Sequence, residues 1–212
     1  REFCGEPTRG ILTGLNEVFV VSEEMMQNIV RTHPADSRLF KPYVRGRDVE
    51  RWTPLDPQEY VIFTQGIGID EYPAVKAYLD QFRQKLEART AVTTIGNKWF
   101  ELHQIAGYKQ QSEPKIVYPS VSHECRFTLN SDGTIVDKTC YFLLSDSKYL
   151  LALLNSSLTL FLFRQLGAER RGGYLEFLGQ YVARLPVRCI AFTTPTDERA
   201  RLVGVGITEA TE

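Results

Sequence analysis

The chain has 212 residues, with 25 Lys and Arg against 26 Asp and Glu, so its formal net charge at pH 7 is -1. Hydrophobic residues make up 43% of it and charged residues 24%, which are the proportions of an ordinary folded protein. The neutral balance excludes a strongly basic polyanion binder, so a nucleic-acid surface would have to come from local clustering of charge.

The first half of the chain predicts two strands and two helices. Apolar runs at residues 17–21 and 60–64 indicate buried strands. Ser22 is a good N-cap for a short helix that continues to residue 30. Pro73 suits the first turn of a helix over residues 72–89, where apolar side chains recur at helical spacing.

Short strands come next. Residues 115–118 and 139–144 are apolar runs typical of buried strands. Residues 126–129 and 134–136 flank a loop that contains Gly133, which is typical of a β-hairpin.

Two helices follow, at residues 147–154 and 157–166, and we expect Gly167 to end the second one. Together they form an apolar run long enough to resemble a membrane span, but residues 155–157 in its middle are polar. The run therefore predicts two buried helices around a polar joint and no membrane segment. Strands and helices are mixed without strict βαβ alternation, so we expect an α+β fold with mixed, mostly antiparallel strands and a few packed helices.

Cysteine usage bears on the cellular setting. Four cysteines far apart, with no C-x-x-C pair, fit a reducing cytoplasmic location better than a disulfide scaffold. The chain starts at Arg1 with no signal-peptide pattern, so we expect a fragment of a longer polypeptide.

Motifs for catalysis are weak. The sequence contains no nucleophile elbow, zinc-protease motif, phosphate loop or dinucleotide fingerprint. Glu113 and Lys115 have the spacing of a metal-dependent nuclease but no obvious acidic partner, so a small nuclease stays an alternative. His123, Cys125 and Cys140 are more typical of core thiols and a surface imidazole than of metal ligands. We expect no catalytic residue and no metal site in this chain.

Clustered arginine is the more informative feature. Residues 38–52 hold five basic and two acidic side chains, with Tyr43 and Trp52 interleaved. Arg45 and Arg47 flank Gly46, which lets the backbone approach a phosphate closely, and a guanidinium binds phosphate or the guanine edge with two hydrogen bonds. A second cluster also combines arginine, glycine and an aromatic ring and contains Arg164, Arg170, Arg171 and Tyr174. A weaker one contains Lys98.

Several motifs occur in a specific order. They are residues 13–16 (TGLN) with 19–20 (FV), 41–49 (KPYVRGRDV), 72–76 (YPAVK), 114–119 (PKIVYP), 139–142 (TCYF), 154–156 (LNS), 171–174 (RGGY) and 185–187 (LPV). With this ordered set, residues 10–187 resemble the TaqI-like C-terminal specificity domain of adenine-N6 DNA methyltransferases, including fused type IIG restriction–modification enzymes.

The resemblance implies a target recognition domain that grips double-stranded DNA, reads bases in the major groove and helps to position a flipped adenine. The family's catalytic tetrapeptide, Asn-Pro-Pro-Tyr, is not in this sequence. The catalytic domain, with S-adenosylmethionine and with Mg if a nuclease is fused, would then lie in an N-terminal part of the same polypeptide. We expect residues 1–9 to be a lead-in, residues 10–190 the recognition domain, and residues 191–212 a tail or the start of a further element.

Roles for single residues follow from their chemistry. Arg45 and Arg47 are the first candidates for base contacts, followed by Arg126 and Tyr174. The candidates for phosphate contacts are Lys41, Lys98, Arg164, Arg170 and Arg171. Two alternatives stay open, because residues 45–48 could instead hold a turn and residues 171–173 could serve the junction with the catalytic domain. A protein-interaction module without DNA contact is a further alternative function.

Overall fold

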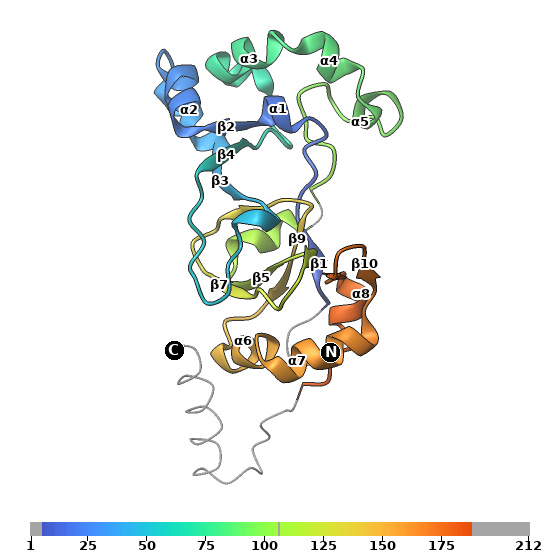
Figure 1. Cartoon of the computed structure of the whole chain (residues 1–212). Coiled ribbons are helices and arrows are strands. Elements are labelled where there is room, and N and C mark those ends of the chain that lie inside the picture. Colours follow the sequence, from blue (N-terminus) through green and yellow to red (C-terminus); the bar gives the residue numbers. More distant parts are fainter. Residues whose placement is uncertain (1–5, 106, 188–212) are drawn as a thin grey trace.

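The computed structural model describes residues 6–105 and 107–187, which form an α+β fold with three small sheets. Figure 1 shows helices α1–α5 with strands β2, β3 and β4 at one end of the molecule, strands β5 and β9 in the middle, and helices α6 and α7 at the other end. The predicted fold class is confirmed. Of the eight strand pairings in the described residues, seven are antiparallel and only the pairing of β3 with β8 is parallel.

The first sheet has the order β2–β4–β3–β8. Its strands are β2 (Val20–Ser22), β3 (Phe40–Val44), β4 (Glu59–Ile62) and β8 (Ile135–Val136). The predicted strand at residues 17–21 is partly wrong. It begins as one turn of helix, α1 (Asn16–Phe19), in which the amide of Phe19 donates to the carbonyl of Leu15, and becomes extended only at Val20.

Helix α2 (Glu23–Val30) starts where the sequence predicts, because the Ser22 hydroxyl accepts a hydrogen bond from the Met25 amide at 3.2 Å. The short helix η1 (Pro34–Leu39) then carries the buried Asp36. The Asp36 carboxylate accepts from the amides of Ala74 and Val75 at 2.9 and 3.2 Å, so it caps the next long helix from outside.

The helix expected over residues 72–89 is divided. It follows η3 (Ile69–Glu71) and consists of α3 (Pro73–Asp80) and α4 (Arg83–Glu87), with α5 (Thr90–Thr93) after them. Pro73 stands in the first turn, as predicted. At the break, the amides of Gln81 and Phe82 bond to carbonyls three residues back, and this tighter turn ends the regular α-helical pattern.

The central sheet has the order β1–β9–β5–β7 and is entirely antiparallel. Its strands are β1 (Thr8–Arg9), β5 (Lys115–Pro119), β7 (Thr128–Asn130) and β9 (Cys140–Leu144), with η4 (Tyr108–Ser112) before β5. All five residues of β5 are buried, as expected for the middle strand of a covered sheet.

The hairpin predicted from residues 126–136 is wrong. β7 pairs with β5, whereas β8 pairs with β3 in the other sheet. The turn between them explains the divergence, because Asp132 accepts hydrogen bonds from Asn130 and Thr134 and Gly133 has a φ of 78°. This connection joins the two sheets through one short loop.

Helices α6 (Lys148–Leu154) and α7 (Ser157–Leu166) are capped by Ser147 and Ser156, which confirms the positions of the predicted pair. The expectation that both are buried is wrong for α7, because Leu158 and Phe161 are 63% and 62% exposed. In the polar joint Asn155 is buried, and its amide exchanges two hydrogen bonds of 2.9 Å with the backbone of Phe127. Gly167 ends α7 with a φ of -89°, which any residue can adopt, so its backbone conformation does not require glycine. Glycine is needed there for space, because a Cβ would lie 2.6 Å from the Phe163 ring.

A third sheet has the order β10–β11–β6, and helix α8 (Gly179–Val182) follows it. Its strands are β6 (Val121–Ser122), β10 (Glu169–Arg170) and β11 (Tyr174–Glu176). Within the described residues no single helix is long and apolar enough to cross a membrane; only α6 and α7 taken together, bent by 59°, have the length and composition.

The domain boundaries expected from the sequence stay predictions. Thr8 and Arg9 of the expected lead-in form β1 and pair with β9. The expected tail, residues 191–212, lies outside the described residues.

Candidate functional site

An open pocket of about 430 Å³ collects residues from five segments that are far apart in the sequence. We call it the arginine pocket; it is lined by Asn16, Arg45, Gly46, Arg47, Pro119, Ser120, Val121, Arg126, Asp137, Lys138 and Thr139. The pairing of β8 with β3 and the position of β5 beside β9 bring these segments together. Three of the predicted base-contacting arginines, Arg45, Arg47 and Arg126, therefore share one site.

The turn that carries the first two arginines is η2 (Gly46–Asp48), and it is held rigidly. The Arg45 amide donates to the Asp48 carboxylate, and the Asp48 amide donates to the Arg45 carbonyl, each at 2.9 Å. The Gly46 amide donates to the Thr139 hydroxyl at 2.8 Å, and a Cβ on Gly46 would lie 2.8 Å from the Thr139 carbonyl oxygen. The close backbone approach predicted for Gly46 is thus made to Thr139.

Arg45 and Arg126 are occupied by carboxylates of the chain. Nη2 of Arg45 donates to one oxygen of Glu59 at 2.9 Å, and Nε lies 2.8 Å from the other oxygen without meeting hydrogen-bond geometry, so the ion pair has two close contacts and one hydrogen bond. Arg126 pairs with Glu50 and also reaches the carbonyl of Arg47 at 3.5 Å, while its buried Nε has no hydrogen-bond partner among the described residues. These two arginines hold the pocket wall in place. For Arg45 this agrees with the alternative that residues 45–48 hold a turn.

Arg47 has different surroundings. Its side chain is 68% exposed, with Nε 3.3 Å from Asp48 and Nη2 4.0 Å from Glu59. Exposed ion pairs of this kind contribute little, so the guanidinium is available to a ligand. Lys138, also exposed, lies on the same pocket.

The charge of the pocket is balanced. Four cationic side chains, Arg45, Arg47, Arg126 and Lys138, line it together with the acidic Asp137. The three arginines also form ion pairs with Glu59, Asp48 and Glu50, respectively, which do not line the pocket. Burial raises the pKa of Asp137, whose carboxylate accepts hydrogen bonds from the Thr139 amide and hydroxyl. The pocket is therefore a place for one or two directed contacts and not a broad basic surface.

The second arginine cluster forms the turn between β10 and β11. Gly172 and Gly173 have φ angles of 86° and 79°, which a tight turn requires. Arg170 pairs with Glu176, whereas Arg171 is exposed. Tyr174 is 43% exposed and packs on the ring of His123, with ring centroids 3.6 Å apart.

This hairpin is joined to the arginine pocket. β11 pairs with β6 so that Glu176 lies opposite Val121, and Val121 lines the pocket. Tyr174 is thus on the strand next to β6, whereas Arg170 lies one strand further away on β10 and Arg171 lies in the turn between β10 and β11.

The other predicted residues are dispersed. Lys98 is exposed in a loop whose carbonyls, at Trp99 and Glu101, accept from the buried Arg89 at 2.6 and 2.9 Å. Lys41 is half-buried in β3, and Arg164 is exposed in the last turn of α7. None of these three lines the arginine pocket.

Asn16 and Lys138 line the arginine pocket and were not among the predicted site residues. Asn16 lies in a segment that the sequence assigns to a turn, and Lys138 is not part of a basic cluster. Only the tertiary structure places them beside the arginines, so no local signal could have found them.

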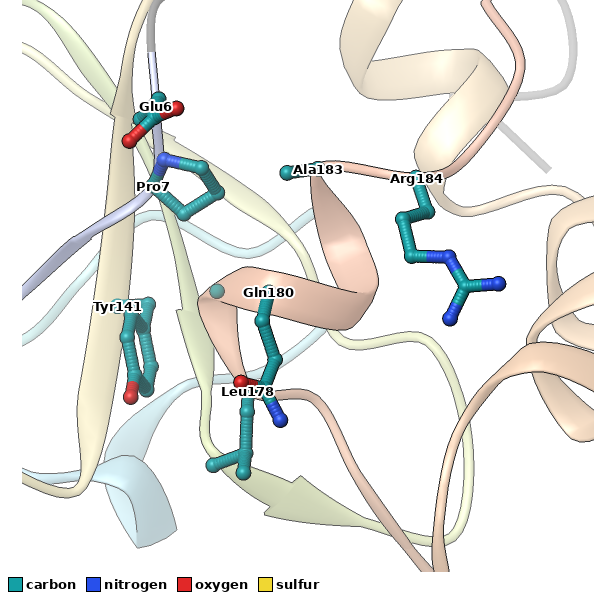
Figure 2. A pocket seen from close by; sticks show the side chains of 8 residues that line it. Glu6, Pro7, Tyr141, Leu178, Gln180, Ala183 and Arg184 are labelled. Atoms are coloured by element: carbon teal, nitrogen blue, oxygen red, sulfur yellow. The ribbon is translucent and has the colours of Figure 1, made fainter.

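A second pocket, of about 540 Å³, lies between the residues before β1 and helix α8. Figure 2 shows Pro7 and Tyr141 on one side and Leu178 and Ala183 on the other, with the Arg184 side chain extending away from them. It brings together no cluster of titratable groups that would support chemistry.

The nuclease alternative finds no support. Lys115 is fully buried and donates to the Gln111 carbonyl and to Asn130, while Glu113 is exposed. No group of three His, Cys, Asp or Glu side chains in the described part of the chain could hold a metal ion. Cys125 and Cys140 are free and buried, and burial raises the pKa of Cys125 to about 12.

Comparison with known proteins identifies the family. The family model described as the TaqI-like C-terminal specificity domain matches residues 41–187. The type II methyltransferase M.BanIII of Aneurinibacillus aneurinilyticus is 24% identical over 225 residues, which cover 90% of this chain and 38% of that protein. M.BstVI of Geobacillus stearothermophilus is 19% identical over 211 residues, which cover 96% of this chain and 36% of that protein. The chain thus spans little more than a third of these relatives.

Two solved structures share the fold. The type IIL restriction–modification enzyme MmeI, solved in complex with DNA, matches with a TM-score of 0.74 and 14% identity over 95% of this chain and 27% of that one. The type IIG restriction endonuclease BpuSI matches with a TM-score of 0.58 and 11% identity over 97% of this chain and 26% of that one. Since the family model covers more than half of the chain, the chain belongs to the TaqI-like C-terminal specificity domain family.

Proposed function

We propose that this chain is the DNA-binding specificity module of a site-specific adenine-N6 DNA methyltransferase or of a fused restriction–modification enzyme. The exposed guanidinium of Arg47, on a turn fixed to Thr139, carries the proposal because such a group can form two hydrogen bonds with a guanine edge or a phosphate. The DNA complex of MmeI supports double-stranded DNA as the partner.

The methyltransferase relatives are nearly three times as long as this chain, which supports a catalytic domain elsewhere in the same polypeptide. S-adenosylmethionine, and Mg if a nuclease is fused, would be bound by that domain. The free, buried thiols Cys125 and Cys140 are compatible with a cytoplasmic location.

In this proposal Arg47 and Lys138 contact the duplex from the arginine pocket, and Arg171 and Tyr174 contact it from the adjoining hairpin. Arg45 and Arg126 act through Arg47, because their guanidinium groups are held by Glu59 and Glu50. The proposed phosphate contacts of Lys41, Lys98, Arg164 and Arg170 extend the surface beyond the pocket.

The test compares Arg47→Ala with Lys85→Ala, which removes an equally exposed positive charge on α4. Arg47→Ala should weaken binding to the preferred duplex by roughly 5- to 150-fold, the equivalent of one lost two-point base contact. Lys85→Ala should leave the affinity within about twofold, and both variants should unfold at the wild-type urea concentration. Fluorescence anisotropy with labelled duplex measures the affinities.

Equal affinities for the two variants would contradict the assignment of Arg47. Arg45→Ala provides a further contrast, because it leaves Glu59 without its two-point partner and should lower the free energy of unfolding by about 1–3 kcal/mol. Arg47→Ala should therefore lower the DNA affinity at unchanged stability, whereas Arg45→Ala should lower the free energy of unfolding.

A further inference from the structure

Asn16 lies on the arginine pocket with one end of its side-chain amide already engaged. The Thr13 hydroxyl accepts from the Leu15 amide at 3.3 Å and donates its own proton to Oδ1 of Asn16. Within the described residues, the Nδ2 group of Asn16 has no hydrogen-bond partner, and the side chain is only partly buried. The amide therefore offers two free donors at the rim of the pocket that also presents Arg47.

The turn that holds Asn16 is rigid. Thr13 is 1% exposed, and its carbonyl accepts from Nη1 of the buried Arg89 at 3.1 Å and from the His103 amide at 3.2 Å. Gly14 has a φ of 81°, and a Cβ there would lie 2.9 Å from the Cβ of His103. The position of Asn16 is thus set by buried contacts behind it before any ligand arrives.

We infer that Asn16 is a DNA-contacting residue, which donates its amide hydrogens to an acceptor of the bound duplex, and that Thr13 is a positioning residue. Because the Thr13 hydroxyl donates to Oδ1 of Asn16, the Nδ2 end of the Asn16 amide is the end that is left to face the pocket. The acceptor is either an oxygen or nitrogen on a base edge or a phosphate oxygen, since both suit an amide donor. The inference rests on the proposed function, because it names a further contact of the same site.

The substitution Asn16→Asp separates this role from a structural one. Aspartate has nearly the same shape and keeps an oxygen for the Thr13 hydroxyl, so the turn is preserved. It replaces the two free donors by a charged acceptor, which repels phosphate and cannot donate to a base acceptor. A residue that only holds the turn would tolerate this change.

Asn28→Asp is the matched control, because Asn28 is exposed on α2 and does not line the arginine pocket. Binding of this chain to a randomised pool of short duplexes and to the duplex selected from it is measured at low salt, with thermal unfolding alongside. Asn16→Asp should bind at least tenfold more weakly than the wild type with an unfolding midpoint within a few degrees, and Asn28→Asp should match the wild type.

Asn16→Ala then identifies the acceptor. An equal loss on selected and random duplexes assigns a phosphate, and a loss confined to the selected duplex assigns a base edge. Thr13→Val should relax the preference between these duplexes, and Thr13→Ser, which keeps the hydroxyl, should restore it.

Two results would overturn the inference, and they are distinguishable. If wild type binds DNA and Asn16→Asp binds it equally well, Asn16 is not a contact while the proposed function stands. If the wild type retains no duplex at all, the proposed function fails and the contact fails with it.

Discussion

Arg45 and Arg47 are two positions apart in the sequence and have opposite surroundings. Arg45 is held at two points by Glu59, whereas Arg47 is 68% exposed beside a weak contact with Asp48. Residue type and spacing made them equal candidates for base contacts. The structure separates them because the acidic residue that engages Arg45 comes from β4, fourteen positions away.

Lys115 is a buried charge whose effect on stability depends on pH. Its ammonium group donates to Gln111 and Asn130 inside the central sheet, and burial lowers its pKa from 10.5 to about 8. Between about pH 8 and pH 10.5 the unfolded chain binds more protons at this residue than the folded protein does. The contribution of Lys115 to the free energy of unfolding should therefore rise with pH across that window, by about 3 kcal/mol.

Lys115→Met removes this rise. Urea unfolding at pH 7.5 and pH 10.5 should show the stability of the wild type increasing relative to the variant as the pH is raised. Groups such as Cys125, whose pKa is raised by burial, destabilise the fold in the same range but are common to both proteins and cancel in the difference. A difference that does not change with pH would contradict the assignment.

At the scale of elements, those with a local chemical signal were predicted well. Ser22, Ser147 and Ser156 each cap a helix where the sequence places one, and β5 and β9 are the apolar runs expected. These elements depend on hydrogen bonds and packing within a few residues, so their patterns are visible in the sequence.

The elements that were predicted wrongly depend on distant partners. β8 leaves β7 and joins β3, and the helix at residues 72–89 breaks near Phe82, which packs on the core. The candidate site has the same origin. Arg45 and Arg47 were predictable from their clustering, but their grouping with Arg126, Asn16 and Lys138 requires tertiary contacts that no local pattern specifies.

The η2 turn is the element on which the site depends most. A Cβ on Gly46 would lie 2.8 Å from the Thr139 carbonyl oxygen, and this backbone atom can shift only at a cost in free energy. Gly46→Ala should therefore displace the turn, lower the free energy of unfolding by about 1–3 kcal/mol and weaken DNA binding through Arg47. Urea unfolding and fluorescence anisotropy measure the two effects.

Gly68→Ala is the control for this substitution. A Cβ on Gly68 meets only the Glu71 side chain, at 3.1 Å, and Gly68 has a φ of -89°. Its stability and DNA affinity should stay close to those of the wild type. Equal effects of the two substitutions would show that the close approach at Gly46 does not matter.

At the scale of the whole molecule, the residues that we propose as DNA contacts form a small and nearly neutral surface. The arginine pocket joins the β10–β11 hairpin through β6, and the turn at Asn16 connects it to the Lys98 loop through Arg89. The chain has a net charge of only -1, so we expect the proposed DNA binding to come from these placed groups and not from a general attraction to polyanions.

Selection from a randomised duplex pool with this chain at low salt tests the central claim, sequence-specific DNA recognition, most directly. We expect a short enriched motif, with an affinity for it that falls as salt is raised because phosphate contacts release counterions. Retention of duplex without a motif would contradict base reading by this chain. No retention at low salt would contradict DNA binding altogether and favour a protein-interaction module.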